Sequence, residues 1–370
     1  MKITVPTIDF GTSKIVTMVA QSNGERCDIV GSGAVPYSGY LQDGWNNPDE
    51  IRDVIRTAID QAQKTGNCRI HELNVGVPGM FTRVIVKEVH VSLTGPDPHV
   101  TAQDVRACFK LAEESGGDRI IHSAPAWFRV DDGKKTLSPV GIKGRELSAM
   151  IALVTADKYF IDDITYRLRD MDIEPREFYS TVAGEATYAL SQDERDKTAM
   201  LIDIGYLCTD VMVMEGDALI FHKCLDIGGG HISADIAEQL NIPFPFVEEK
   251  IKQTYSFNST NQDETYVIPA TEDEPARTVR RDEVTPIIEA KVEEIAEAIN
   301  KALEEGGVKL GKWSNVYLTG GGLILNKGGK DFLAGKLHRI IREAQRTNNK
   351  MTSHVFSSAV GLTILVVTTQ

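Results

Sequence analysis

The sequence has few features of a secreted, membrane-spanning or nucleic-acid-binding protein. Its 40 lysines and arginines are outnumbered by 53 aspartates and glutamates, which gives a formal net charge of −13. This charge disfavours sequence-independent binding to nucleic acid or to an anionic membrane. The N-terminus lacks the apolar segment of a signal peptide, and the longest apolar run near the end, residues 359–367, is too short to span a bilayer. We therefore expect a cytoplasmic protein that does not bind nucleic acid.

Cysteine is scarce, and its spacing suggests no site. The five cysteines form no C-x-x-C pair, and no histidine stands at zinc-ligand spacing from them. Such residues are typical of core thiols in a reducing compartment. They are Cys27, Cys68, Cys108, Cys208 and Cys224.

Length and composition predict a multidomain globular protein. A chain of 370 residues with 42% hydrophobic and 25% charged residues is long enough for two or more domains with real cores. Helical signals are clear in places. Asn47 offers an N-cap, Pro48 suits a first helical position, and apolar residues recur at helical spacing until Gly66. Thr101 with Asp104 three residues on predicts a second capped helix.

Two segments repeat an acidic-glycine turn, TIDFGTSK at residues 7–14 and LIDIGYLCTD at residues 201–210. Each belongs to an apolar run typical of a buried strand, so Asp9 and Asp203 would emerge where a strand becomes a hairpin. An aspartate there can hold Mg²⁺, usually through water, and the small residues after it let backbone N–H groups approach a phosphate. One such turn also fits an ordinary hairpin. Two of them favour a polyphosphate site.

A third segment, VYLTGGG at residues 316–322, is an apolar strand that runs into three glycines. A backbone without side chains can lie against a flat, uncharged surface such as a base and its ribose. Together, the two turns and the glycine run predict a nucleotide site.

The order of these segments resembles the actin-like ATPase superfamily, which includes actin, bacterial filament proteins, Hsp70 chaperones and sugar kinases. The resemblance covers the whole chain. It implies an α/β fold in which two related domains flank a nucleotide cleft, with ATP and Mg²⁺ as cofactors and with Asp9 and Asp203 as catalytic residues and metal ligands. Asp210 would order the metal or the attacking water.

Residues 83–155 differ from the rest and predict an inserted α+β subdomain. The phrases VTAQDV (100–105), RIIHSAP (119–125) and SPVGIKGREL (138–147) resemble the extra subdomain of FtsA, the actin-like protein of the bacterial division ring. In FtsA this subdomain serves contacts along the filament and with other division proteins. The prolines and glycines also fit plain turns in a surface module. The predicted domains are 1–82 with 156–195, the insertion 83–155, 196–243 with 312–370, and an upper subdomain 244–311.

The second turn departs from the superfamily pattern D-x-G-G-G-x-x-D. Tyr206 and Leu207 replace two glycines, which adds bulk and restricts φ. We expect nucleotide binding with slow or no hydrolysis, at most a slow ATPase. The helix near residue 185 often carries a water-positioning Glu or Gln in the superfamily. Glu185 lies two positions beyond that place, so it is a catalytic candidate with a structural role as the alternative.

Three further stretches match FtsA-like phrases. DIGGG at 226–230 fits a helix start beside the ribose, or a plain turn. EKIK at 249–252 resembles a helix that meets ribose and adenine, although a solvated helix face is the alternative. Residues 280–295 resemble the FtsA subdomain that receives the C-terminal tail peptide of FtsZ. The predicted nucleotide-binding residues are Gly11, Thr12, Ser13, Lys14, Gly205, Asp210, Gly229, Gly230, Glu249, Lys252, Gly320, Gly321 and Gly322.

The resemblance implies an ATP-binding scaffold that self-associates into filaments and links FtsZ-type filaments to other division proteins at the inner face of the membrane. FtsA ends in a basic amphipathic helix, whereas the last residues here show no basic amphipathic face. Either such a helix has been removed from this sequence, or the protein is a divergent paralogue that reaches the membrane only indirectly, through a partner. The alternatives are a PilM-like adaptor of pilus assembly and, with less support, a small-molecule phosphotransferase of the same superfamily.

Overall fold

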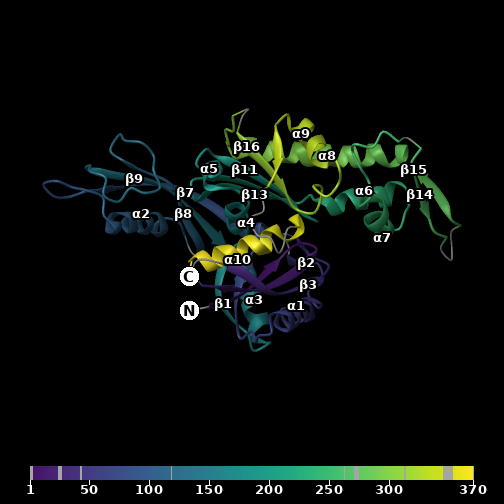
Figure 1. Cartoon of the computed structure of the whole chain (residues 1–370), viewed down its shortest axis with the longest axis horizontal. Coiled ribbons are helices and arrows are strands. Elements are labelled where there is room, and N and C mark those ends of the chain that lie inside the picture. Colours follow the sequence, from purple (N-terminus) through teal and green to yellow (C-terminus); the bar gives the residue numbers. More distant parts are fainter. Residues whose placement is uncertain are drawn as a thin grey trace. The chain divides into compact units, whose positions relative to one another are not determined.

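A five-stranded sheet has the order β10-β6-β1-β2-β3. Figure 1 labels its strands β1, β2 and β3. Strands β1, β2 and β3 form an antiparallel meander, and β6 runs parallel to both β1 and β10. The side chains at the end of β1 are buried, so the residues that follow it are held at a fixed edge of the sheet. The strands are β1 (Ile3–Phe10), β2 (Lys14–Ser22), β3 (Cys27–Pro36), β6 (Glu72–Val77) and β10 (Glu174–Ser180).

This computed structural model describes residues 3–23, 27–41, 44–117, 119–261, 263–270, 275–311, 314–344 and 353–369. The chain divides into two compact units. The first unit runs to Leu201 and also contains Met212–Lys223 and the end of the chain after residue 344. The second unit consists of Ile202–Val211 and Cys224–Ala344.

Helix α1 (Ile51–Gly66) covers the first sheet through an apolar stripe that includes Ile55 and Ile59. Its predicted N-cap is wrong. The helix begins at Ile51 with Glu50 at the cap, and Asn47 lies outside the helix, where its side-chain amide donates to the Glu50 carboxylate at 3.2 Å. The other elements of this layer are β4 (Tyr40–Leu41), β5 (Gly44–Trp45), η1 (Gly79–Phe81), α3 (Lys158–Arg169), α4 (Thr181–Ala189) and α5 (Gln192–Arg195).

A three-stranded antiparallel sheet of order β7-β9-β8 is inserted between η1 and α3. Its helix α2 starts as predicted: the Thr101 hydroxyl accepts from the Asp104 amide, and the Asp104 carboxylate accepts from the Thr101 amide at 2.8 Å. Cys108 and Ala112 of this helix are buried in the same core cluster as Leu147 and Leu153 of the sheet. The elements are β7 (Thr82–Ser92), α2 (Ala102–Glu114), β8 (Ile120–Val130) and β9 (Glu146–Ala156).

A second five-stranded sheet has the order β13-β12-β11-β16-β17. Its strands are β11 (Ala199–Ile204), β12 (Thr209–Glu215), β13 (Ala218–Leu225), β16 (Asn315–Thr319) and β17 (Ile341–Glu343). The second unit adds the hairpin β14 (Thr265–Ile268) and β15 (Arg277–Arg280) and the helices α6 (Gly229–Gln239), α7 (Phe244–Phe246), η2 (Val247–Lys252), α8 (Arg281–Glu305) and α9 (Gly329–Leu337).

The last described elements, η3 (His354–Phe356) and α10 (Ser357–Thr369), return to the first unit. Helix α10 packs on α4 and β1, and the hydroxyls of Thr7 and Thr363 are hydrogen-bonded at 2.8 Å. The predicted assignment of residues 312–370 to the second domain therefore does not hold for α10, because its apolar residues fill the core beside β1. Residue 312 itself lies outside the described residues. The other predicted boundaries stay predictions.

Candidate nucleotide site

In the first unit, Asp9 lies one residue before the end of β1 and is only 3% exposed. The Ser358 hydroxyl, at the start of α10, donates to Asp9 Oδ2 at 2.7 Å. Burial raises the pKa of the Asp9 carboxyl, although the Ser358 hydrogen bond and the charge of Lys14 act in the opposite direction. A buried carboxylate of this kind gains from a cation that compensates its charge.

The turn after Asp9 is held by main-chain hydrogen bonds. The Gly11 amide donates to the Lys14 carbonyl at 3.1 Å, which closes the hairpin. The Tyr37 hydroxyl donates to the Gly11 carbonyl at 2.7 Å, and the Tyr37 amide donates to the Ser13 carbonyl at 3.2 Å. Thr12 is buried at the tip of the turn. The predicted phosphate turn is thus a tight and well-anchored hairpin.

Glu185 lies in α4 and is 1% exposed. Its backbone packs so closely on α10 that a methyl group at Gly361 would lie 2.5 Å from the Glu185 Cα. This packing agrees with the structural alternative for Glu185, and its catalytic role stays a prediction.

In the second unit, the glycine run lies against the second acidic-glycine turn. Gly320 has a φ of +87°, and a side chain there would lie 2.0 Å from Asp203 Oδ1. The Gly322 amide donates to the Ile204 carbonyl at 2.7 Å, and a side chain at Gly322 would lie 2.4 Å from the Gly205 carbonyl. The two segments can only meet in this way because Gly320 and Gly322 have no side chains.

The DIGGG segment joins the same cluster. It forms the start of α6, with Gly228 at the N-cap, as predicted. The Gly229 amide donates to the Gly205 carbonyl at 2.9 Å, and the Gly230 amide donates to the Tyr206 carbonyl at 2.7 Å. A side chain at Gly229 would lie 2.4 Å from the Gly322 Cα. We call this convergence of residues 203–206, 228–230 and 320–322 the glycine cradle; Gly321 lies within it.

A polar group borders the glycine cradle. Lys252 is 6% exposed, donates to Glu248 Oε1 at 3.1 Å, and lies 5.9 Å from the centre of the Tyr206 ring. Glu248 also accepts a hydrogen bond from the Ser233 hydroxyl of α6. Burial lowers the pKa of Lys252, and the Glu248 carboxylate partly offsets this effect.

The structure does not bring Glu249 into this group, because its side chain is exposed. Its neighbour Glu248 makes the contacts instead. Sequence reasoning missed Glu248, together with Ser233, Asn326 and Ser358. The i,i+4 spacing of Glu248 and Lys252 was a readable signal. No sequence signal pointed to Asn326, because its partners are distant in the chain. Its side-chain amide donates to the carbonyls of Lys252 and Tyr255, at 2.6 and 3.0 Å, across more than 70 residues.

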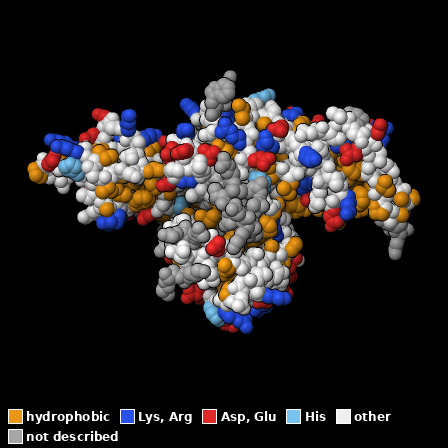
Figure 2. Space-filling view, in the orientation of Figure 1, with side chains coloured by type: hydrophobic (Ala, Val, Ile, Leu, Met, Phe, Trp, Pro, Cys, Tyr) orange, Lys and Arg blue, Asp and Glu red, His pale blue; other side chains and the backbone are white. Residues whose placement is uncertain are grey.

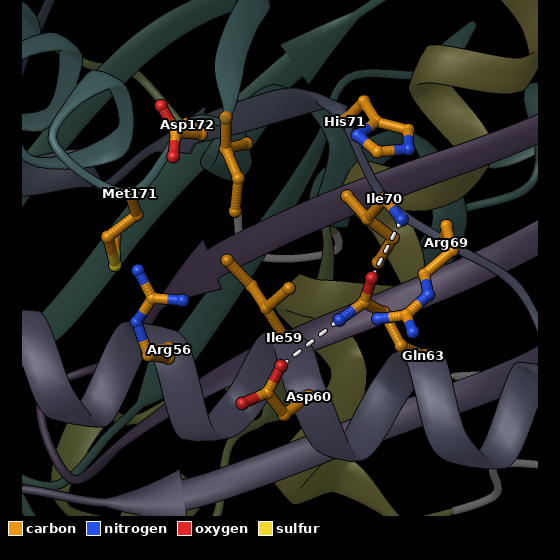
Figure 3. Close-up of a pocket in the computed structure, with 10 residues that line it drawn as sticks. Arg56, Ile59, Asp60, Gln63, Arg69, Ile70, His71, Met171 and Asp172 are labelled. Atoms are coloured by element: carbon orange, nitrogen blue, oxygen red, sulfur yellow. Dashed lines mark hydrogen bonds between the residues drawn. The ribbon is translucent and has the colours of Figure 1, made fainter.

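A cavity of about 240 Å³ elsewhere in the first unit contains none of the predicted site residues (Figure 3). Ile59 and Ile70 contribute apolar surface to it, and Gln63 accepts from the Ile70 amide at 2.9 Å. Figure 3 shows Arg56 and Asp60 together on α1, so charges of both signs line it. Nothing in this lining favours a ligand of one charge.

Comparison with known proteins assigns the family. The family "Cell division protein FtsA" matches residues 200–361, and the "SHS2 domain inserted in FTSA" matches residues 79–155. The two matches together cover more than half of the chain. The chain belongs to the FtsA-like cell-division proteins.

Two relatives show how far this FtsA-like chain has diverged. It is 26% identical to the cell division protein FtsA of Pseudomonas aeruginosa over 320 residues, which is 85% of this chain and 76% of the relative. It is also 26% identical to FtsA of Bacillus subtilis over 306 residues, 81% of this chain and 70% of the relative.

Solved structures confirm the predicted actin-like ATPase fold, and the match of residues 79–155 confirms its FtsA-type insertion. The FtsA-like chain matches the "PilM-PilN type IV pilus biogenesis complex" with a TM-score of 0.64 and 16% identity, over 99% of each chain. It matches MreB5 of Spiroplasma citri bound to AMPPNP with a TM-score of 0.59 and 11% identity, over 99% of this chain and 96% of MreB5. Among the described residues, no helix has the length and apolar character needed to cross a bilayer.

Proposed function

We propose that this FtsA-like chain is an ATP-binding scaffold of cell division. It binds ATP with Mg²⁺, associates with copies of itself, and links FtsZ-type filaments to other division proteins at the inner face of the membrane. The observation that carries the nucleotide part is the glycine cradle beside Asp203. Backbone segments with little side-chain bulk meet there beside a carboxylate and the N-terminus of α6, which suits a nucleoside and its phosphates.

The residues fit a magnesium ion chemically. Mg²⁺ prefers oxygen ligands, keeps several waters, and is usually held by one or two carboxylates together with substrate phosphates. Asp9 and Asp203 would supply these carboxylates. Thr12 and Ser13 would meet phosphate through backbone N–H groups, while Gly11, whose amide is bonded to the Lys14 carbonyl, would let the phosphate approach because it has no side chain. The bound ion would neutralise phosphate charge.

The Tyr206 substitution supports slow or absent turnover. A side chain at Gly230 would lie 2.9 Å from Tyr206 Cε2, so the tyrosine ring packs directly on the start of α6. This ring occupies space that a glycine would leave open, and it stiffens the turn. We propose that the nucleotide acts mainly as a ligand that stabilises one state of the protein.

A binding experiment tests the nucleotide site. Calorimetric titration with ATP and Mg²⁺ should show one site per chain, and Asp9→Ala and Asp203→Ala should each weaken binding at least about tenfold, because each removes a metal ligand. The control is Asp132→Ala, an exposed aspartate of the inserted subdomain. Absence of ATP binding by the folded wild-type protein, or equal affinity in all variants, would refute this part.

The FtsZ link is proposed on the surface formed by β15 and the first turn of α8. Arg281 is buried there, donates to the Ser256 carbonyl and to Glu264 at 2.6 and 3.0 Å, and lies 4.2 Å from the centre of the Tyr255 ring. The exposed neighbour Arg280 makes a two-pronged ion pair with Asp282. Arg281 thus supports the surface, and Arg280 presents a charge on it.

Fluorescence anisotropy with a labelled C-terminal FtsZ peptide tests this surface. Arg280→Glu should weaken binding about tenfold or more, because it reverses an exposed charge at the contact. Arg169→Glu is a matched control: Arg169 makes the same two-pronged pair with Glu174, and its side chain is equally exposed, 60% in both cases. An equal loss of peptide affinity in Arg280→Glu and Arg169→Glu would show that the peptide does not bind specifically at the surface around Arg280.

A pilus-assembly adaptor is the second candidate, supported by the likeness in fold to the PilM–PilN complex. The match of residues 79–155 to the domain inserted in FtsA favours the division role. Binding of a pilus-protein peptide in place of the FtsZ peptide would reverse this preference.

A further inference from the structure

Two cysteines that lie 16 positions apart in the sequence meet in the second unit. The ligand atoms of Cys208, Asp210 and Cys224, two sulfurs and a carboxylate oxygen, all lie within 4.8 Å of one another. Cys208 directly precedes β12, Asp210 lies in β12, and Cys224 lies near the end of the neighbouring strand β13. Cys208 is buried, and the other two residues are half-buried. Sequence spacing gave no sign of this group, because the hairpin alone brings it together.

Short backbone segments hold the three residues in place. The Gly205 amide donates to the Cys208 carbonyl at 2.9 Å, which makes a tight turn. The Thr209 hydroxyl donates to the Ile227 carbonyl at 2.7 Å, so the start of β12 is fastened to the residues that follow Cys224. A side chain at Gly228 would lie 2.9 Å from the Cys208 amide nitrogen, which shows how closely the two segments pack. Ligands on such anchored positions lose little freedom when they bind.

We propose that Cys208, Asp210 and Cys224 form a binding site for a thiophilic divalent cation, with Zn²⁺ as the representative ion. Two sulfurs with one oxygen suit zinc, whereas Mg²⁺ prefers oxygen ligands alone. Zinc–sulfur bonds of about 2.3 Å place tetrahedral ligand atoms about 3.8 Å apart. The observed group reaches this spacing with small side-chain movements. A water molecule would complete the fourth position.

Zinc binding here does not depend on the proposed nucleotide function. Competition between the cation and Mg–ATP, in contrast, rests on the proposed nucleotide function. Asp210 is a predicted nucleotide-site residue, so an ion that engages Asp210 would compete with Mg–ATP. The cation site is therefore tested first without nucleotide, and a failure of ATP binding leaves that test intact.

Cobalt is the optical probe. The full chain is stripped with EDTA, kept reduced with a phosphine, and titrated with Co²⁺ while its absorption is recorded. The wild type should bind one Co²⁺ per chain with a thiolate-to-cobalt charge-transfer band, and Zn²⁺ should displace it. Cys208→Ser and Cys224→Ser should weaken Zn²⁺ binding by at least about 100-fold, and Asp210→Asn by about 10-fold or more. The double variant Cys27→Ser/Cys68→Ser, in the first unit, should behave as wild type.

Three results would overturn the site. The first is the absence of a charge-transfer band at one equivalent of Co²⁺, and the second is a band that survives in the Cys208→Ser/Cys224→Ser double variant. The third is a protein that forms a Cys208–Cys224 disulfide in air and still binds no metal after this disulfide has been reduced. Circular dichroism checks the fold of each variant. If the buried Cys208→Ser variant misfolds, Cys224→Ser and Asp210→Asn decide the test, because these positions are half-buried.

Discussion

His122 of β8 is held neutral by its surroundings. Burial lowers its pKa to about 4, and the nearby Asp217 carboxylate only partly opposes this effect. In the unfolded chain a histidine titrates near pH 6.5. Between pH 6.5 and 4 the unfolded state therefore binds a proton that the folded state does not, so stability falls as the pH falls through this window.

We expect the protein to lose up to about 2 kcal/mol between pH 7 and pH 5 through this residue. Urea unfolding followed at both pH values should show a smaller loss for His122→Gln than for the wild type. His71→Gln is the control, because His71 is exposed. If His122→Gln keeps the full pH dependence, other groups are responsible.

The sequence indicates which segments carry polar residues of the candidate site, but it does not indicate which side chains of a segment contact each other and which face solvent. The EKIK phrase predicts Glu249 and Lys252 at the nucleotide site, and the structure places this segment in a π-helical turn at Val247–Lys252. A turn with i→i+5 hydrogen bonds rotates each side chain relative to an α-helix. Glu248 contacts Lys252, four residues further along the chain, and Glu249 faces solvent. The i,i+4 spacing of Glu248 and Lys252 was a signal for this pair, but the likeness to the EKIK phrase pointed to the adjacent Glu249 instead.

At the scale of elements, α4 and α10 touch through glycine. A side chain at Gly184 would lie 2.9 Å from the backbone of Gly361, and one at Gly361 would lie 2.5 Å from the Glu185 Cα. Gly361→Ala must push the helices apart, so we expect a loss of about 1–3 kcal/mol in the free energy of unfolding. Because α10 carries Ser358, the hydrogen bond to Asp9 should weaken as well. Thermal and urea unfolding measure the first effect.

Gly335→Ala gives a control of opposite sign. Gly335 lies inside α9, and a side chain there would meet nothing within 4 Å. Alanine should be neutral or stabilise by up to about 1 kcal/mol, because it restricts the unfolded chain and favours helix. A Gly361→Ala variant as stable as Gly335→Ala would show that the helices do not depend on this close approach.

Elements with strong local signals were predictable. The capping box of α2 appears where the sequence indicates it. The sequence did not predict which unit α10 packs in, because an apolar helix can be buried in the core of either unit. Only pairing over 349 positions, as between Ser358 and Asp9, fixes it in the first unit. The three segments of the glycine cradle could be singled out from their glycines, but the hydrogen bonds and close contacts between these segments could not be predicted.

For the whole molecule, the inserted subdomain offers a surface for assembly. Figure 2 shows hydrophobic side chains gathered on the face of this subdomain that is in view. Val140 and Ile142 are 59% and 41% exposed on either side of Gly141, whose φ is +88°. The Gly141 amide donates to the Val100 carbonyl at 2.8 Å, and the Val100 amide donates to the Ile142 carbonyl at 2.9 Å. These apolar residues thus lie on an anchored turn, which suits a contact site.

We expect this turn to contribute to a head-to-tail contact between copies, which extends into filaments because such contacts need not close. In sedimentation assays, wild-type protein with ATP and Mg²⁺ should form larger species than protein without nucleotide, and Val140→Glu should prevent this by placing a charge in an apolar contact. Ile340→Glu is the matched control, since Ile340 is similarly exposed, 61%, but lies in the second unit. If Val140→Glu assembles as the wild type does while Ile340→Glu fails, the contact lies on the second unit, and the exposed apolar turn at residues 140–142 serves a different partner.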